Sequence, residues 1–124
     1  GDVSGIIYIV DQRSPVDMYI GTGGGPEGVL AAAALSCHGG QMQTRLVLDN
    51  DEAIRAKKMG IVDLKKKYNI DEMIKGDVMF CATGVTTGDL AKGVEDLGNE
   101  FKVNTFALHR SQKIVKTISN IYNK

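Results

Sequence analysis

Residues 17–37 read DMYIGTGGGPEGVLAAAALSC, and this stretch decides the fold of the chain. The apolar run 18–20 is typical of a β-strand. The glycines that follow let the backbone adopt positive φ angles and approach a ligand closely. Pro26 suits the first helical position, where its missing N–H costs nothing. The apolar residues after it predict a helix that is buried on most sides and ends at the glycine pair 39–40. The stretch therefore predicts a strand, a glycine loop and a helix.

The glycine loop and the start of this helix predict an anion site. Free backbone N–H groups at a helix N-terminus attract phosphate. Glu27 lies in the same first turn, where its carboxylate would repel a phosphate unless a cation lay between them. The pairing suggests a divalent metal ion together with a phosphate group. The alternative is that Glu27 only complements the helix dipole and that the glycines form a tight turn.

The same glycines also match a dinucleotide-binding pattern. Gly23, Gly25 and Gly28 give G-x-G-x-x-G after a predicted strand, and Asp49 ends the next one, near the distance expected for a ribose-binding acid. This pattern predicts a Rossmann-like dinucleotide-binding module. The proline and the glutamate inside the loop count against it, because one stiffens the turn and the other would face a pyrophosphate without a metal. A P-loop is excluded, because no Lys-Ser or Lys-Thr pair follows the glycines.

Local signals predict the remaining elements. Strands are expected at 43–48 and at 78–82, the second of them buried. A terminal hairpin is expected at 99–110 and 113–121, joined by Ser111 and Gln112. Helical segments are expected at 51–59, with Asn50 as cap, and at 63–68, 71–75 and 89–94. This order predicts an α/β fold with a mixed sheet and flanking helices. Ligands of such sheets bind beyond the carboxyl ends of the strands, where the loops 21–26 and 83–88 are expected.

Composition excludes several classes of protein. The 124 residues suffice for at most one domain with its own core. The 15 basic and 15 acidic residues cancel, which argues against a nucleic-acid partner. We find no apolar run of membrane length and no signal peptide, so no membrane partner is expected. Because the chain begins with Gly1 rather than methionine, we expect it to be a piece of a larger protein.

The two cysteines indicate a reducing environment. Cys37 and Cys81 are too few for a disulfide framework, and each lies in a predicted apolar element. We expect both to be reduced core residues of a cytoplasmic protein. Neither the pair Cys37 and His38 nor His109 has the spacing of a metal site.

Four stretches of the chain resemble class II fructose-1,6-bisphosphatases. They are GTGGGPEGVLAAAAL at 21–35, GQMQTRL at 40–46, NDE…AKKMG at 50–60 and ATGVTTGDL at 82–90. The resemblance covers nearly the whole chain but only the C-terminal part of that family, whose members are much longer. It implies that residues 1–124 form a C-terminal α/β domain, the second half of the layered sugar-phosphatase fold shared with inositol monophosphatases.

The resemblance also changes one local prediction. Residues 6–10 (IIYIV) have strand propensity. In the family a helix is implied at this position, capped by Asp2 or Ser4, and we expect a helix here.

The function that this resemblance implies is hydrolysis of fructose 1,6-bisphosphate to fructose 6-phosphate, a step of gluconeogenesis, with Mg²⁺ or Mn²⁺. Glu27 would be a metal ligand, and Gly24 would contact the substrate through its backbone. Gly1 and Asp2 resemble the last two residues of an Asp-Gly-Asp substrate-binding motif whose first Asp is missing; Asp2 as a plain helix cap is the alternative. The other metal-binding acids would precede this chain, so the isolated piece is expected to be inactive. A homo-oligomer is also implied.

The agreement of four stretches favours the phosphatase over the dinucleotide-binding module, which would make the G-x-G-x-x-G match coincidental. A third hypothesis is a structural or subunit-interface piece without chemistry of its own.

Overall fold

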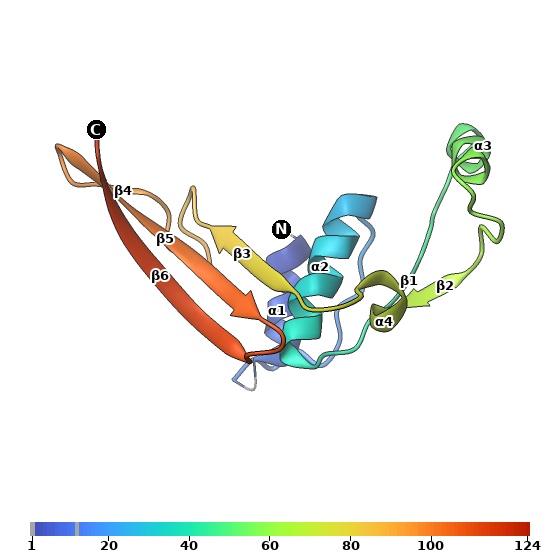
Figure 1. Cartoon of the computed structure of the whole chain (residues 1–124), viewed down its shortest axis with the longest axis horizontal. Coiled ribbons are helices and arrows are strands. Elements are labelled where there is room, and N and C mark those ends of the chain that lie inside the picture. The colour runs from blue at the N-terminus through green and yellow to red at the C-terminus, as the bar shows by residue number, and fades with distance from the viewer. Residues whose placement is uncertain (1, 12) are drawn as a thin grey trace.

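The computed structural model describes residues 2–11 and 13–124 (Figure 1). Its body consists of helices packed against an antiparallel sheet, and a smaller two-stranded sheet with a further helix extends from the body as an arm. The elements in chain order are α1 (Asp2–Val10), α2 (Gly25–His38), β1 (Gln43–Arg45), α3 (Asn50–Lys58), β2 (Lys67–Asn69), α4 (Ile70–Met73), β3 (Met79–Thr83), β4 (Glu95–Asp96), β5 (Glu100–His109) and β6 (Ile114–Asn123).

The main sheet is built on the terminal hairpin. Strands β5 and β6 pair antiparallel along their whole length, from Glu100 opposite Asn123 to His109 opposite Ile114, which confirms the predicted hairpin. On its other edge β5 pairs with β3 and β4, again antiparallel. Every pairing between described strands is antiparallel, so the prediction of a mixed sheet is wrong. A parallel pair needs two strands joined by a crossover, and no strand precedes α2 among residues 2–11 and 13–24.

Helix α2 is the centre of the body. It packs against α1, α4 and the main sheet (Figure 1). Its alanines allow close approach, and two groups of buried side chains surround it: Ile6, Ala31, Ala32, Leu35, Ile70 and Ile74 in one, and Ala34, Phe80 and Leu108 in the other. Near its start, Val29 is 48% exposed and Leu30 is 50% exposed. The prediction of a helix buried on most sides therefore holds only for its C-terminal half.

The predicted starts and ends of the helices are largely confirmed. Residues 6–10 lie in α1, as the family resemblance implied and contrary to their strand propensity. Helix α2 ends at Gly39, which has a φ of 71° and donates its N–H to the carbonyl of Leu35. This left-handed conformation favours glycine. The cap of α3 is wrong by one residue, because Asp49 rather than Asn50 occupies the N-cap.

The arm differs more from prediction. Strands β1 and β2 pair antiparallel at its base, and α3 lies at its far end (Figure 1). The strand predicted at 43–48 stops at Arg45, because 46–48 have no neighbouring strand. The helical segment predicted at 63–68 is wrong, since a turn leads there into β2. Helix α4 lies close to the prediction at 71–75.

Three further predictions of secondary structure or burial are wrong. Residues 18–20 form no strand, and Met18 is 72% and Ile20 85% exposed. The loop 17–24 therefore does not follow the carboxyl end of a strand. The prediction that ligands bind there because it lies beyond a strand end has no basis in the structure. Residues 89–94 form a loop rather than a helical turn. Strand β3 matches the prediction at 78–82 within one residue, but Phe80 is its one buried side chain.

The cysteines are both free thiols, as predicted. Cys37 is half-buried in α2. Cys81 is exposed on β3, so its prediction as a core residue is wrong. Strand side chains alternate between the two faces of a sheet, and Phe80, the neighbour of Cys81, points into the core.

The chain exposes far more surface than a compact domain of its size. Its accessible surface is 8910 Å². A folded monomer of 13.4 kDa is expected to expose about 6,500 Å². Large apolar side chains contribute to the excess, among them Met59 at 82% and Val62 at 92% exposed. Within residues 2–11 and 13–124, none of the helices has the length and apolar character needed to cross a bilayer.

Candidate functional site

The site predicted from the sequence lies at the start of α2. Gly24 is the N-cap, with φ −65° and ψ 151°, and its carbonyl accepts the N–H of Gly28 at 3.0 Å. Pro26 is the second residue of α2, one position later than predicted, because Gly25 is the first. Because the N-cap is a glycine, no side chain caps the helix. The backbone N–H groups of the first turn therefore remain available to an external acceptor.

Glu27 lies directly against Gly24. A Cβ placed on Gly24 would collide with Oε2 of Glu27, so the carboxylate folds back over the N-cap. The structure thus brings together two of the residues predicted for the site. The loop can hold this arrangement because residue 24 has no side chain.

The Glu27 carboxylate differs from the glutamates at the same position of two other helices in its hydrogen bonding. Helices α3 and α4 also have a glutamate at the third position, and both complete a capping box. Glu52 accepts the N–H of Asp49 at 3.0 Å, and Glu72 accepts the N–H of Asn69 at 3.1 Å. Within the described part of the chain, Glu27 makes no hydrogen bond or ion pair. Its two oxygens are available to a cation.

Glu27 can therefore supply one ligand to a divalent metal ion, but the set of ligands is incomplete. Carboxylate oxygens are the donors that Mg²⁺ and Mn²⁺ prefer. No group of three His, Cys, Asp or Glu side chains among the described residues could hold a metal ion. Further ligands would have to come from outside the described residues.

The other predicted substrate residues lie at the chain start. Gly1 lies outside the described residues. Asp2 is the first residue of α1, and its side chain is not described. Ser4 lies inside α1 and so is not its cap. The roles of Gly1 and Asp2 stay predictions.

The structure does not assemble the alternative dinucleotide site. The side chain of Asp49 accepts the N–H of Glu52 at 2.8 Å and is engaged as the cap of α3. Figure 1 shows α3 at the far end of the arm, away from the start of α2 where Gly23, Gly25 and Gly28 lie. The acid and the glycines of the pattern do not meet.

Comparisons with known proteins identify the family of the chain. Residues 1–122 match the family described as bacterial, glpX-encoded fructose-1,6-bisphosphatase. The chain belongs to this family.

Three curated relatives show the extent of the match. In an alignment of 137 positions the chain is 31% identical to fructose-1,6-bisphosphatase 2 class 2 of Escherichia coli K12, and the alignment covers 98% of this chain and 42% of the relative. It is 32% identical to fructose-1,6-bisphosphatase class 2 of Haemophilus influenzae, covering 98% of this chain and 41% of the relative. It is also 32% identical to D-fructose 1,6-bisphosphatase class 2/sedoheptulose 1,7-bisphosphatase of Synechococcus sp. JA-3-3Ab, covering 100% of this chain and 40% of the relative. The chain thus spans about two fifths of the length of these relatives.

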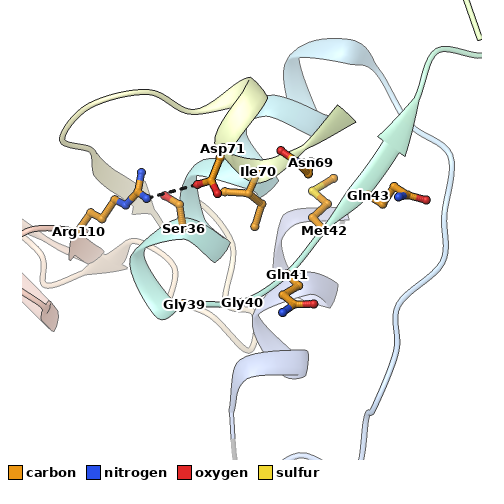
Figure 2. Close-up of a pocket in the computed structure, with 10 residues that line it drawn as sticks. All are labelled: Ser36, Gly39, Gly40, Gln41, Met42, Gln43, Asn69, Ile70, Asp71 and Arg110. Atoms are coloured by element: carbon orange, nitrogen blue, oxygen red, sulfur yellow. Dashed lines mark ion pairs between the residues drawn. The ribbon is translucent and has the colours of Figure 1, made fainter. Parts of the chain in front are cut away.

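A groove lies at the opposite end of α2 from Glu27. It has a volume of about 570 Å³ and is shown in Figure 2. Gly39 at its edge lies about 18 Å along the helix axis from Glu27, at about 1.5 Å per residue. Arg110 reaches Asp71 across it at 3.7 Å. The groove is too distant to share a ligand with Glu27.

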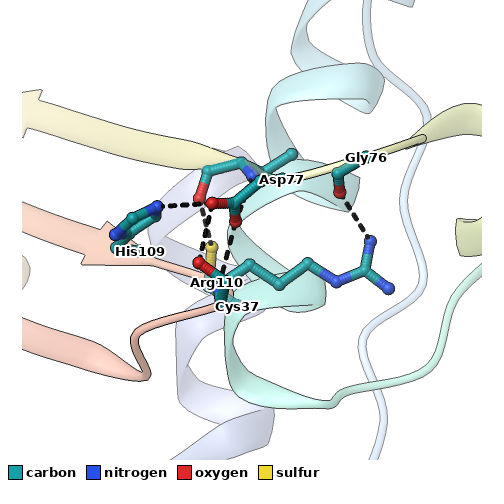
Figure 3. Close-up of polar contacts among 7 residues, drawn as sticks. Cys37, Gly76, Asp77, His109 and Arg110 are labelled. Carbon is teal, nitrogen blue, oxygen red and sulfur yellow. Dashed lines mark hydrogen bonds and ion pairs between the residues drawn. The ribbon is translucent and has the colours of Figure 1, made fainter.

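A polar cluster that the sequence did not reveal joins the hairpin turn to β3 (Figure 3). Asp77 Oδ2 accepts the hydroxyl of Ser111 at 2.7 Å and lies 2.8 Å from Nε2 of His109. Asp77 Oδ1 accepts the N–H groups of Ser111 at 3.1 Å and Val78 at 2.9 Å. His109 and Ser111 are 32 and 34 residues from Asp77, so no local spacing could have indicated them. The cluster fixes the register of the sheet.

The cluster predicts an acid-sensitive contribution to stability. The Ser111 hydroxyl, followed by His109 and the backbone N–H groups, holds the pKa of Asp77 well below its ordinary value, although partial desolvation opposes this. Because the pKa is lower in the folded state, the contribution is complete above the unfolded pKa of about 4 and is lost as the pH falls below it. We expect Asp77→Asn to lower the urea midpoint at about pH 7. The difference in urea midpoint between the variant and the wild type should shrink as the pH falls from about 4 to about 2. A difference that is independent of pH would contradict this.

Gly24→Ala tests the contact between Gly24 and Glu27. A φ of −65° suits alanine, so backbone strain is not expected. The new methyl group would displace the Glu27 carboxylate, which is the far end of a flexible side chain. In the full-length protein we expect a KM raised by about tenfold, because small misplacements in a site are costly, and little change in Tm. Gly28→Ala is the matched control, because its Cβ would meet no atom within 4 Å. Equal effects of the two substitutions would contradict the assignment.

Proposed function

We propose that the full-length protein carrying this chain hydrolyses the 1-phosphate of fructose 1,6-bisphosphate, giving fructose 6-phosphate and phosphate. The observation that carries this proposal is the uncommitted Glu27 carboxylate beside free backbone N–H groups, in a chain of the fructose-1,6-bisphosphatase family. The relatives in Escherichia coli and Haemophilus influenzae are named for the same substrate. Gluconeogenesis and a cytoplasmic location are parts of the proposal.

The residues of this chain would act by holding the substrate and one metal ion. The first-turn N–H groups of α2 would donate to phosphate oxygens, as helix N-termini do. Gly24 would allow the sugar phosphate to approach the backbone, since it has no side chain. Glu27 would supply a negative charge and an oxygen donor at a fixed point. When bound, Mg²⁺ or Mn²⁺ would supply Lewis-acid activation and neutralise charge on the phosphate.

Surface area supports a partner for this chain. The excess over a compact domain is about 2,400 Å², which exceeds the size of a standard protein interface. We propose that the remaining length of a family protein covers part of this surface and supplies the other metal ligands. A homo-oligomer would cover a further part.

Phosphate release from the full-length protein tests the proposal. We expect turnover of fructose 1,6-bisphosphate with Mn²⁺ or Mg²⁺, complete loss with a chelator, and recovery when excess metal is returned. Sedoheptulose 1,7-bisphosphate belongs in the same assay, because the Synechococcus relative is named for both substrates. Binding of NAD without a divalent metal, together with no phosphate release, would contradict the proposal in favour of the dinucleotide module.

A further inference from the structure

Tyr19 lies between the two elements that carry the predicted substrate residues. A Cβ on Gly5 of α1 would lie 2.6 Å from Cε2 of the Tyr19 ring, and a Cβ on Gly21 would lie 3.1 Å from Cε1. The two ring edges therefore face different glycines, one in α1 and one in the loop before α2. Gly5 has no room for a side chain while the ring stays in place, and a side chain at Gly21 would make the ring yield by a few tenths of an ångström.

Tyr19 is also less exposed than its two neighbours in the chain, in a segment without regular structure. Residues 16–24 contain no helix or strand, so no regular hydrogen bonding fixes them. The neighbours Met18 and Ile20 are 72% and 85% exposed, whereas Tyr19 is 39% exposed. Within the described part of the chain the Tyr19 hydroxyl makes no hydrogen bond. The ring, rather than the hydroxyl, holds the segment.

The position of the ring relates it to the proposed site. Gly5 lies one helical turn after Asp2, the first residue of α1. Gly21 lies three residues before Gly24, whose N-cap position adjoins the Glu27 carboxylate. The contact with Gly5 attaches the loop before α2 to α1, whereas Gly21 is only two residues from Tyr19 in the same loop.

We propose that Tyr19 is a positioning residue of the sugar bisphosphate site. Its ring holds the glycine loop at a fixed place relative to the N-terminus of α1, so that the loop backbone and Asp2 bind one substrate molecule together. The inference rests on the proposed function. It adds a residue that touches neither substrate nor metal and acts through Gly5 and Gly21.

The test uses the full-length protein with fructose 1,6-bisphosphate and saturating Mn²⁺. We expect Tyr19→Ala to raise KM by about tenfold and to change kcat by less than about threefold, because misplacing binding groups costs substrate affinity. Tyr19→Phe keeps the ring, and its KM should stay within about twofold of wild type. Gly5→Ala, which pushes the ring away, should raise KM like Tyr19→Ala. Gly88→Ala is the control, because its Cβ would meet no atom within 4 Å.

Thermal unfolding tests the contact itself. Alanine favours a helix over glycine, so Gly5→Ala should lower Tm when Tyr19 is present and raise it in the Tyr19→Ala background. That reversal of sign, together with the rise in KM, supports the proposal.

Three results would overturn it. A KM of Tyr19→Ala within twofold of wild type, with only Tm lowered, would make the ring purely structural. An equal rise in KM for Tyr19→Phe would place the hydroxyl on the substrate instead. A wild-type protein that releases no phosphate would overturn the proposed function together with this proposal, whereas the first two results overturn this proposal alone.

Discussion

Glu27→Gln is expected to lower turnover of fructose 1,6-bisphosphate by at least about 100-fold in the full-length protein. Glutamine keeps the size of the side chain but removes the charge that a metal ion requires. A positioned metal ion is worth several kcal/mol of transition-state stabilisation, and each ~1.4 kcal/mol changes the rate tenfold. The fold should survive, because loss of a first-turn acid costs about 0.3–1 kcal/mol through the helix dipole. Measurements of kcat at saturating Mn²⁺ and of Tm check both parts.

Glu52→Gln is the matched control for this substitution. Glu52 occupies the same third position of α3, but its carboxylate accepts the N–H of Asp49 in a capping box. Glutamine can also serve in a capping box, so Glu52→Gln should leave both turnover and Tm nearly unchanged. If Glu27→Gln behaved like Glu52→Gln, Glu27 would be only a helix-dipole residue. In the dinucleotide hypothesis Glu27→Gln would instead improve NAD binding.

A protein consisting of residues 1–124 alone is expected to release no phosphate from fructose 1,6-bisphosphate. Glu27 is a single carboxylate, and the described residues hold no cluster of three metal-binding side chains. One carboxylate does not bind the two metal ions that clamp a phosphoryl transfer. A phosphate-release assay over a range of Mn²⁺ concentrations measures this, with the full-length protein as positive control. Mn²⁺-dependent turnover by residues 1–124 would contradict the account.

The same protein should also associate or bind a hydrophobic dye. Its exposed apolar side chains include Met18, Ile20, Met59 and Val62, and contiguous exposed apolar surface marks an interaction site. Light scattering on a size-exclusion column and dye fluorescence measure this. A monomer that binds no dye would show that the surface needs no partner.

The sequence predicted those parts of the fold that local chemistry determines. Pro26 and Gly39 lie at the ends of α2 because a proline fits the first turn and a glycine fits the left-handed cap. The terminal hairpin was predictable because its two strands are adjacent in the chain. Apolar runs at 18–20 and 46–48 were wrongly predicted as strands, since a strand requires a partner and the sequence does not show whether one is present.

The candidate site was predicted in part for the same reason. Gly24 and Glu27 are three residues apart in one helix start, so their proximity followed from local structure. The packing of Tyr19 on Gly5 joins residues from separate segments, and a glycine inside a predicted helix was the one available signal. The bonds of Asp77 to His109 and Ser111 depend on the pairing of β3 with β5, which no pattern in the sequence specified.

The most direct test of the central claim is equilibrium binding of Mn²⁺ to the full-length protein and to its Glu27→Gln variant, measured by titration calorimetry without substrate. If Glu27 is a metal ligand of a phosphatase site, at least one Mn²⁺ equivalent should bind the variant more weakly, by about tenfold or more. Loss of a group that only hydrogen-bonds to a metal ligand already costs about 10–100-fold in metal affinity. Identical Mn²⁺ affinity and stoichiometry in the two proteins would contradict the account.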